Sequence, residues 1–306
     1  MRVSRRWVVA AAAVLSSLWS VSAQQPEGDG AREEEVVKVA VDLVTVNVSV
    51  TDGGRRPVTG LLAADFLVSD EGREVKLEFF DGQGPASIVF VVDTSTSMKY
   101  EKWAKLKAAL KKFLSRAREG NDYTLVAFAD RPRLVAESVG AQELWQSVLG
   151  LETEGNTALY DAVLLGLDVL GRTPRRHKAL VLLSDGQDIK SRAGLADVQL
   201  EALTRRATIY AVGITLDANP GHLPEVDRKG RDILKGLAAA TGGLALFPEP
   251  EDISRVLDGI HADLSGQYTL GYYAADKEPG WRNILVSLTP AQQRRRLRYQ
   301  QRYLRR

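Results

Sequence analysis

The sequence predicts an α/β fold: a doubly wound, mostly parallel sheet with a flanking all-β domain built from N- and C-terminal strands. Two observations predict it. Between residues 85 and 265, short apolar segments alternate with amphipathic helical segments, as in parallel strands joined by crossover helices. Before and after this region, apolar residues recur at every second position, as in half-buried strands.

The amino-acid composition indicates a globular protein and excludes several kinds of functional site. The 306 residues are 44% hydrophobic and 26% charged, which is typical of a globular chain. The formal net charge is +2, so the chain as a whole has no strong electrostatic attraction for nucleic acid, and we expect no nucleic-acid partner. The chain contains no cysteine, which excludes disulfides, thiolate metal sites and cysteine nucleophiles.

Residues 1–23 have the features of a signal peptide. Arginines precede an apolar core, and small residues at 21–23 predict cleavage after Ala23. The Arg5-Arg6 pair leaves twin-arginine export open beside ordinary secretion. The apolar core is shorter than the roughly 20 residues of a membrane-spanning helix, and no later apolar run reaches that length. We therefore expect a secreted or periplasmic protein with no transmembrane span in the mature chain.

Residues 24–35 are polar and acidic, which predicts a linker. Residues 36–84 are predicted to form an N-terminal β-strand region. Apolar residues alternate through 36–50, and a turn at 70–72 separates further short strands. We place those further strands at residues 61–68 and 75–80.

Residues 85–265 are predicted to form the α/β domain. Pro132 opens one of its segments and predicts an edge strand, because proline cannot donate the backbone hydrogen bond that a central strand needs. We predict strands at residues 88–92, 123–129, 132–139, 179–183, 208–214 and 244–247. We predict helices at residues 99–117, 142–149, 156–170, 195–206, 232–240 and 251–264.

Residues 266–306 return to a period of two, with predicted strands at 267–273, 284–288 and 297–303. They follow the α/β domain just as residues 36–84 precede it. We therefore expect the N- and C-terminal strands to pack together, with the α/β domain inserted between them.

The apolar strand at 88–92 ends at Asp93 and continues as Asp-Thr-Ser-Thr-Ser. This sequence places the oxygens of Asp93, Ser95 and Ser97 on one turn. In open α/β sheets, ligands bind outside the carboxyl ends of the strands. Carboxylate and hydroxyl oxygens suit Mg²⁺, Ca²⁺ or Mn²⁺. Two further oxygen-bearing residues are candidates: Asp185 follows the apolar strand at 179–183, and Thr157 lies at the start of a predicted helix, after a glycine-containing loop.

These three segments resemble the von Willebrand factor type A family. The D-x-S-x-S turn resembles its metal-ion-dependent adhesion site, and GNTALYDA and LLSDGQD resemble the segments that supply a threonine and a second aspartate. Residues 36–80 resemble the leader region of bacterial secreted proteins that carry a related domain. The resemblance implies a Rossmann-like domain and a metal site formed by Asp93, Ser95, Ser97, Thr157 and Asp185.

By the same resemblance, the serine and threonine hydroxyls bind the ion directly and the aspartates act largely through water. The expected ion is Mg²⁺, with Ca²⁺ or Mn²⁺ as alternatives. Because the direct ligands are neutral, the ion stays under-neutralised and attracts an acidic residue of a protein partner. The sequence thus predicts an exported binding or adhesion module and not an enzyme.

Three alternatives stay open. Ser97 and Thr157 could each cap a helix instead of binding a metal. The chain could be a non-catalytic envelope scaffold in which the metal is only structural. A Mg²⁺-dependent phosphohydrolase of the haloacid dehalogenase type also places an aspartate after a buried strand. That family has a second aspartate two residues later, however, where this chain has Ser95.

Residues 294–306 contain seven arginines and no acidic residue. One interpretation is contact with an anionic envelope polymer or lipid. The other is a terminal strand, with Leu297, Tyr299, Gln301 and Tyr303 on one face and arginines on the other. The regular alternation favours the strand.

Overall fold

The computed structural model describes residues 43–82, 84–214, 225–274 and 278–305, which fall within one compact unit. The predicted signal peptide, the predicted linker and residues 36–42 of the first predicted strand lie outside the described residues. Among the described residues, no helix is long and apolar enough to cross a membrane.

The central sheet has six strands in the order β10-β9-β8-β5-β6-β7. All neighbouring pairs are parallel except β6 and β7, which are antiparallel. The predicted edge position of the strand that starts at Pro132 is confirmed. The strands are β5 (Ala86–Asp93), β6 (Asp122–Phe128), β7 (Pro132–Val139), β8 (His177–Ser184), β9 (Thr208–Gly213) and β10 (Ala245–Leu246).

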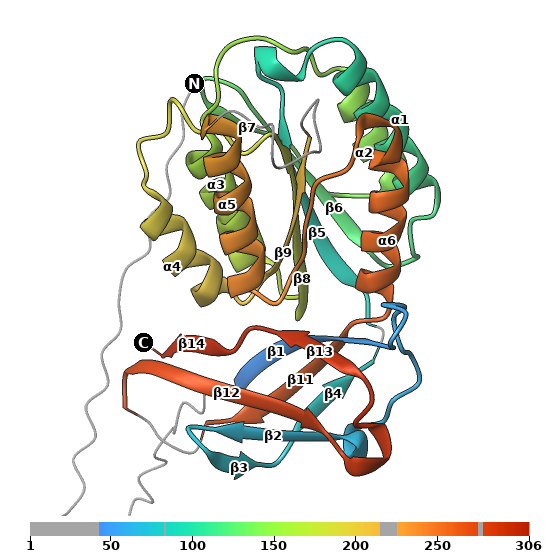
Figure 1. The fold of residues 1–306 in the computed structure, drawn as a ribbon, viewed down its shortest axis with the longest axis vertical. Helices are drawn as coiled ribbons and strands as arrows, with labels where there is room; N and C mark the ends of the chain where they lie inside the picture. Colours follow the sequence, from blue (N-terminus) through green and yellow to red (C-terminus); the bar gives the residue numbers. More distant parts are fainter. Residues whose placement is uncertain (1–42, 83, 215–224, 275–277, 306) are drawn as a thin grey trace, which may run out of the picture. The chain divides into compact units, whose positions relative to one another are not determined.

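Helices cover both faces of this sheet (Figure 1). One face packs against α1 (Glu101–Ser115), α2 (Ala141–Leu149) and α6 (Ile253–Ser265). The other packs against α3 (Leu159–Arg172), α4 (Leu195–Arg205) and α5 (Glu225–Ala240). The predicted doubly wound α/β fold is therefore confirmed.

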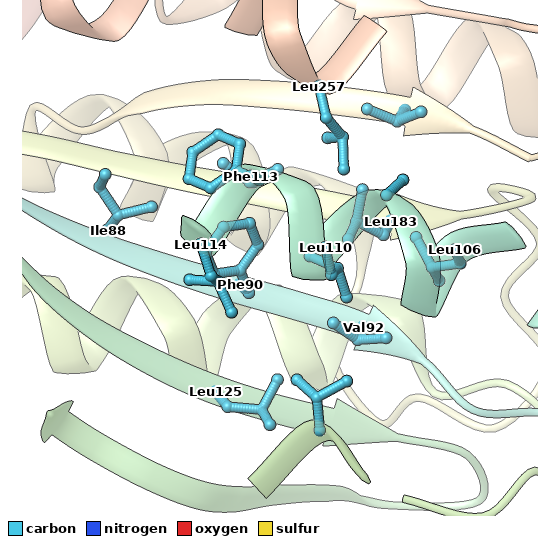
Figure 2. Close-up of a cluster of buried hydrophobic side chains, with 14 of the residues drawn as sticks. Ile88, Phe90, Val92, Leu106, Leu110, Phe113, Leu114, Leu125, Leu183 and Leu257 are labelled. Carbon is cyan, nitrogen blue, oxygen red and sulfur yellow. The ribbon is translucent and has the colours of Figure 1, made fainter. Parts of the chain in front are cut away.

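Side chains of β5 alternate between the two cores, as the pleat of a strand requires. Phe90 and Val92 belong to the cluster under α1 and α6, whereas Val91 belongs to the cluster under α3. Figure 2 shows Phe113 of α1 over Phe90. The two rings pack edge to face, with their centroids 5.2 Å apart. Apolar burial on both faces explains why this segment is an uninterrupted apolar run.

The remaining strands form two antiparallel sheets, in the orders β13-β1-β11-β4 and β14-β12-β2-β3. N-terminal strand β1 lies between two C-terminal strands, which confirms the predicted flanking β-structure built from both ends. The strands are β1 (Leu43–Thr51), β2 (Phe66–Asp70), β3 (Arg73–Val75), β4 (Phe79–Asp81), β11 (Tyr268–Tyr273), β12 (Gly280–Leu288), β13 (Arg296–Tyr299) and β14 (Arg302–Arg305). Short 3-10 helices are η1 (Ala63–Asp65), η2 (Thr96–Met98), η3 (Pro250–Asp252) and η4 (Pro290–Gln292).

Two predicted strands are each divided between the two sheets. The segment at 75–80 separates into β3 and β4, and the segment at 297–303 separates into β13 and β14. At the second break, Gln300 is buried and its amide donates to the carbonyls of Leu203 and Arg302, whereas Gln301 is exposed. The prediction that Gln301 shares a face with Tyr299 and Tyr303 is therefore wrong: both tyrosines are buried, but the alternation is interrupted between them, where the chain changes sheets.

Candidate metal site

The Asp93 carboxylate lies at the end of β5 and is 0% exposed. Val92 is in register with Leu183 of β8, so Asp93 and Ser184 follow side by side at the ends of neighbouring parallel strands. Ser184 Oγ donates to Asp93 Oδ2 at 2.7 Å, and the Ser95 backbone N–H donates to Oδ1 at 2.9 Å. The carboxylate is thus held from both sides by neutral donors.

The two serines of the turn lie side by side. The 3-10 helix η2 brings Ser95 Oγ to 3.0 Å from Ser97 Oγ. Ser95 is 1% exposed, whereas Ser97 is exposed. The hydroxyl pair therefore extends from the buried carboxylate to the protein surface.

The loop that carries Thr157 is hydrogen-bonded to the turn that follows Asp93. The Gly155 carbonyl accepts from both the backbone N–H and the Oγ1 of Thr96, at 3.0 and 2.9 Å. The Glu154 N–H donates to the Thr94 carbonyl at 2.8 Å. Gly155 has a φ of 80°, which a residue with a Cβ adopts only with strain. Thr157 follows it and is 3% exposed.

The loop that carries Asp185 is hydrogen-bonded to Thr157. The Thr157 carbonyl accepts from the backbone N–H groups of Ile189 and Lys190, at 2.8 and 2.9 Å. Asp185 is 4% exposed and directly follows β8. The segments that contain all five predicted residues are therefore joined into one hydrogen-bonded edge of the central sheet.

Two buried carboxylates, Asp93 and Asp185, determine the electrostatics of this edge of the sheet. Burial raises the pKa of the Asp93 carboxyl to about 6, and the negative charge of Asp185 adds to the rise against the hydrogen bonds from Ser95 and Ser184. No salt bridge among the described residues involves either carboxylate. Two buried carboxylates that interact without a counter-charge favour a bound cation.

The capping alternative is wrong for both hydroxyl residues. The N-cap of α1 is Tyr100, because η2 lies between Ser97 and the helix. The N-cap of α3 is Ala158, so the predicted start at residue 156 is early by three residues. Neither hydroxyl is therefore required as a cap.

Two further aspartates, Asp161 and Asp188, have a structural role beside the site. Asp161 accepts from the backbone N–H groups of Arg192 and Ala193, at 3.1 and 3.0 Å. Asp188 accepts from Ser191 Oγ at 2.5 Å and from the Tyr160 N–H at 3.3 Å. They tie the loop after β8 to the first turn of α3.

One residue that touches the site, Ser184, is not among those that the sequence predicted. Its only signal is a hydroxyl residue at the end of an apolar strand, directly before Asp185. Among the described residues, no group of three or more His, Asp or Glu side chains could hold a metal. A metal at this edge would therefore need the hydroxyl oxygens, and such a donor set suits a hard cation.

Comparison with known proteins agrees with this fold. Residues 87–235 match the family model for the von Willebrand factor type A domain. Inter-alpha-trypsin inhibitor heavy chain H3 of Bos taurus is 27% identical over 243 residues, which are 69% of this chain and 26% of that protein. Heavy chain H4 of Sus scrofa is 27% identical over 147 residues, which are 44% of this chain and 16% of that protein. The chain thus spans about a quarter or less of the length of these relatives.

Among solved structures, proximal thread matrix protein 1 from the mussel byssus, with a zinc-occupied MIDAS motif, superposes with a TM-score of 0.50 at 19% identity. The match covers 63% of this chain and 49% of that chain. Similarity at this level of identity shows a shared fold.

Proposed function

Because the chain carries a von Willebrand factor type A domain, a kind of domain that is generally a protein-interaction module, we propose that it is an exported metal-dependent binding protein. Its metal-ion-dependent adhesion site lies at the carboxyl edge of the central sheet. Asp93, Ser95, Ser97, Thr157 and Asp185 hold one divalent cation there. The cation binds an acidic side chain of a protein partner.

The observation that carries the proposal is the buried Asp93 carboxylate, which lies within reach of the charge of Asp185 and is met only by neutral donors. In a medium of low dielectric constant, two such charges are costly until a cation neutralises them. In this proposal the neutral hydroxyls of Ser95, Ser97 and Thr157 supply further oxygen ligands without adding negative charge. A bound divalent ion therefore keeps an affinity for one more anionic ligand.

The exposure of Ser97 supports an approach of the partner from the solvent side of this residue. Ser95 is buried and hydrogen-bonded to Ser97, which faces solvent. We assign the direct ligands to the hydroxyls of Ser95, Ser97 and Thr157, and water-mediated contacts to the two aspartates. The ion is Mg²⁺, with Ca²⁺ and Mn²⁺ as alternatives, since the hard oxygen donors suit all three. The zinc-occupied motif in the mussel protein supports a divalent cation in this kind of domain.

The wider proposal places the protein outside the cytoplasm, because residues 1–23 have signal-peptide features. It also divides the chain after the linker at 24–35 into strands at 36–84, an α/β domain at 85–265 and strands at 266–306. The β-strand parts precede and follow the binding domain in the chain. The chain binds its partner and catalyses no reaction on it.

The test is Mg²⁺ and Mn²⁺ titration of the full chain by calorimetry. Asp93→Ala and Ser95→Ala should abolish the binding isotherm. Ser147→Ala changes a half-buried serine on α2 whose Oγ donates to the Glu143 carbonyl, away from the proposed site, and should leave the isotherm unchanged. Unchanged metal affinity in Ser95→Ala would show that the ion binds elsewhere.

The second measurement is partner capture from native envelope extract, with and without chelator. Capture that requires both the ion and an intact Ser95 supports a metal bridge to the partner. If capture survives chelation while the metal isotherm is lost, the metal is structural and the chain acts as a scaffold.

A further inference from the structure

A groove of about 800 Å³ lies away from the metal site and shares none of its five residues. It runs between α6, β10, the turn after β1 and the start of β13. Its floor is apolar and partly buried. Leu244, Leu246 and Val256 extend from the core under α1 and α6, and Leu297 extends from the core of the antiparallel sheets. The groove therefore lies between two hydrophobic cores. These four side chains line it but leave it open.

Arginines surround this apolar floor. Three of them have an acidic partner: Arg56 with Asp52, Arg255 with Asp252, and Arg298 with Asp263. Arg55 and Arg296 are exposed, and no acidic partner reaches either of them among the described residues. Among the described residues that line the groove, the one acidic side chain is Asp263, which Arg298 already neutralises. The groove thus combines an apolar floor with an uncompensated positive rim.

We propose that this groove binds a single-chain fatty acid. The aliphatic chain lies on the floor formed by Leu244, Leu246, Val256 and Leu297, and the carboxylate meets Arg55 and Arg296. The occupant follows from charge complementarity, because guanidinium groups bind carboxylates with paired hydrogen bonds. A concave, mostly apolar site of this volume suits one drug-sized ligand, and a two-chain lipid is larger.

Gly259 allows the groove to be filled without disturbing the core. It lies on α6, lines the groove, and a Cβ built there meets no atom within 4 Å. A leucine at this position therefore projects into the space that the ligand would occupy. Gly236 on α5 is a matched control, because a Cβ there meets only Gln199 Nε2 at 4.0 Å and the residue does not line the groove.

The test is binding of laurate to the full chain in chelator, measured by calorimetry. Wild type and Gly236→Leu should bind equally, and Gly259→Leu should weaken binding at least tenfold. Equal affinity of Gly259→Leu and wild type would overturn the groove as the site. Because chelator is present throughout, the result is independent of the metal site.

The charged rim is tested with the same probe. Arg55→Ala and Arg296→Ala should each weaken laurate binding about threefold, in line with exposed ion pairs. Arg133→Ala, an exposed arginine on β7, should change nothing. Dodecyltrimethylammonium should bind at least tenfold more weakly than laurate. Equal binding of this cation, or tighter binding of a single-chain lysophosphatidate than of laurate, would overturn the assignment to a carboxylate.

Discussion

Two buried carboxylates in the α/β region have opposite surroundings. Asp263 on α6 is 5% exposed and receives donors from three other elements. Tyr210 Oη donates at 2.5 Å, Ser49 Oγ at 3.1 Å, and the Arg298 guanidinium at 2.6 Å. Asp93 is 0% exposed, and among the described residues it meets only neutral donors and a second carboxylate. One buried carboxylate has its cation built into the chain, and the other does not.

The difference separates a structural role from a binding role. The Asp263 contacts join β9 and α6 to β1 and β13, which connects the α/β core to the antiparallel sheets. Burial, and then the charge of Asp263, raises the pKa of Tyr210 well above its ordinary value, so the phenol stays protonated and donates. A buried charge that is fully paired supports the fold, whereas a buried charge without a partner marks a place for an added ion.

The largest expected effect comes from removing the built-in cation. Arg298→Met leaves Asp263 buried without a counter-charge, which should lower the free energy of unfolding by about 3–5 kcal/mol. Urea denaturation measures this loss. Arg133→Met, which changes an exposed arginine with no acidic partner among the described residues, should stay within about 0.5 kcal/mol of wild type. A loss below about 1 kcal/mol in Arg298→Met would remove the contrast between the two carboxylates.

Neutralising Asp93 should raise the free energy of unfolding, the opposite of the effect expected for Arg298→Met. Its pKa rises from 3.8 to about 6 on folding, so between these values the native state binds more protons than the unfolded state. The contribution of this carboxyl to stability therefore falls as pH rises from about 4 to about 6. At about 1.4 kcal/mol per pKa unit, the full cost at pH 7 is about 3 kcal/mol.

Metal-free Asp93→Asn should therefore be more stable than metal-free wild type at pH 7, by up to about 3 kcal/mol, with the gap closing near pH 4. Thermal unfolding of both proteins in chelator, from pH 4 to pH 8, measures the gap. A variant that is less stable than wild type at pH 7 would contradict the unpaired state of this carboxylate.

The smallest effect on stability is expected at Ser97. Because this side chain is exposed, Ser97→Ala should change the free energy of unfolding by less than about 0.5 kcal/mol. As a proposed metal ligand, it should still lower Mg²⁺ affinity about tenfold or more. Calorimetric titration of Ser97→Ala beside Ser147→Ala separates the two effects. A variant that loses stability but keeps its metal affinity would assign Ser97 to the fold alone.

The sequence by itself determined the α/β class, the edge strand at Pro132 and the end of β5 at Asp93. Each of these depends on local rules: apolar periodicity, the missing N–H of proline, and the change from apolar to hydroxyl residues at a strand end. Because parallel strands end at one edge of their sheet, the same rules also predicted that Asp93 and Asp185 lie at that edge, whereas Thr157 was singled out by the resemblance of its segment to the von Willebrand factor type A family.

Only the tertiary structure decided which groups meet across long separations in the chain. It placed Ser184 on Asp93, divided the last predicted strand between two sheets at Gln300, and gathered Ser49, Tyr210 and Arg298 around Asp263. A period of two or of 3.6 residues reports which face of a segment is buried, but not which distant segment covers it. Whether a buried carboxylate gains a cation from the chain depends on that non-local packing, so two aspartates with similar burial have opposite surroundings.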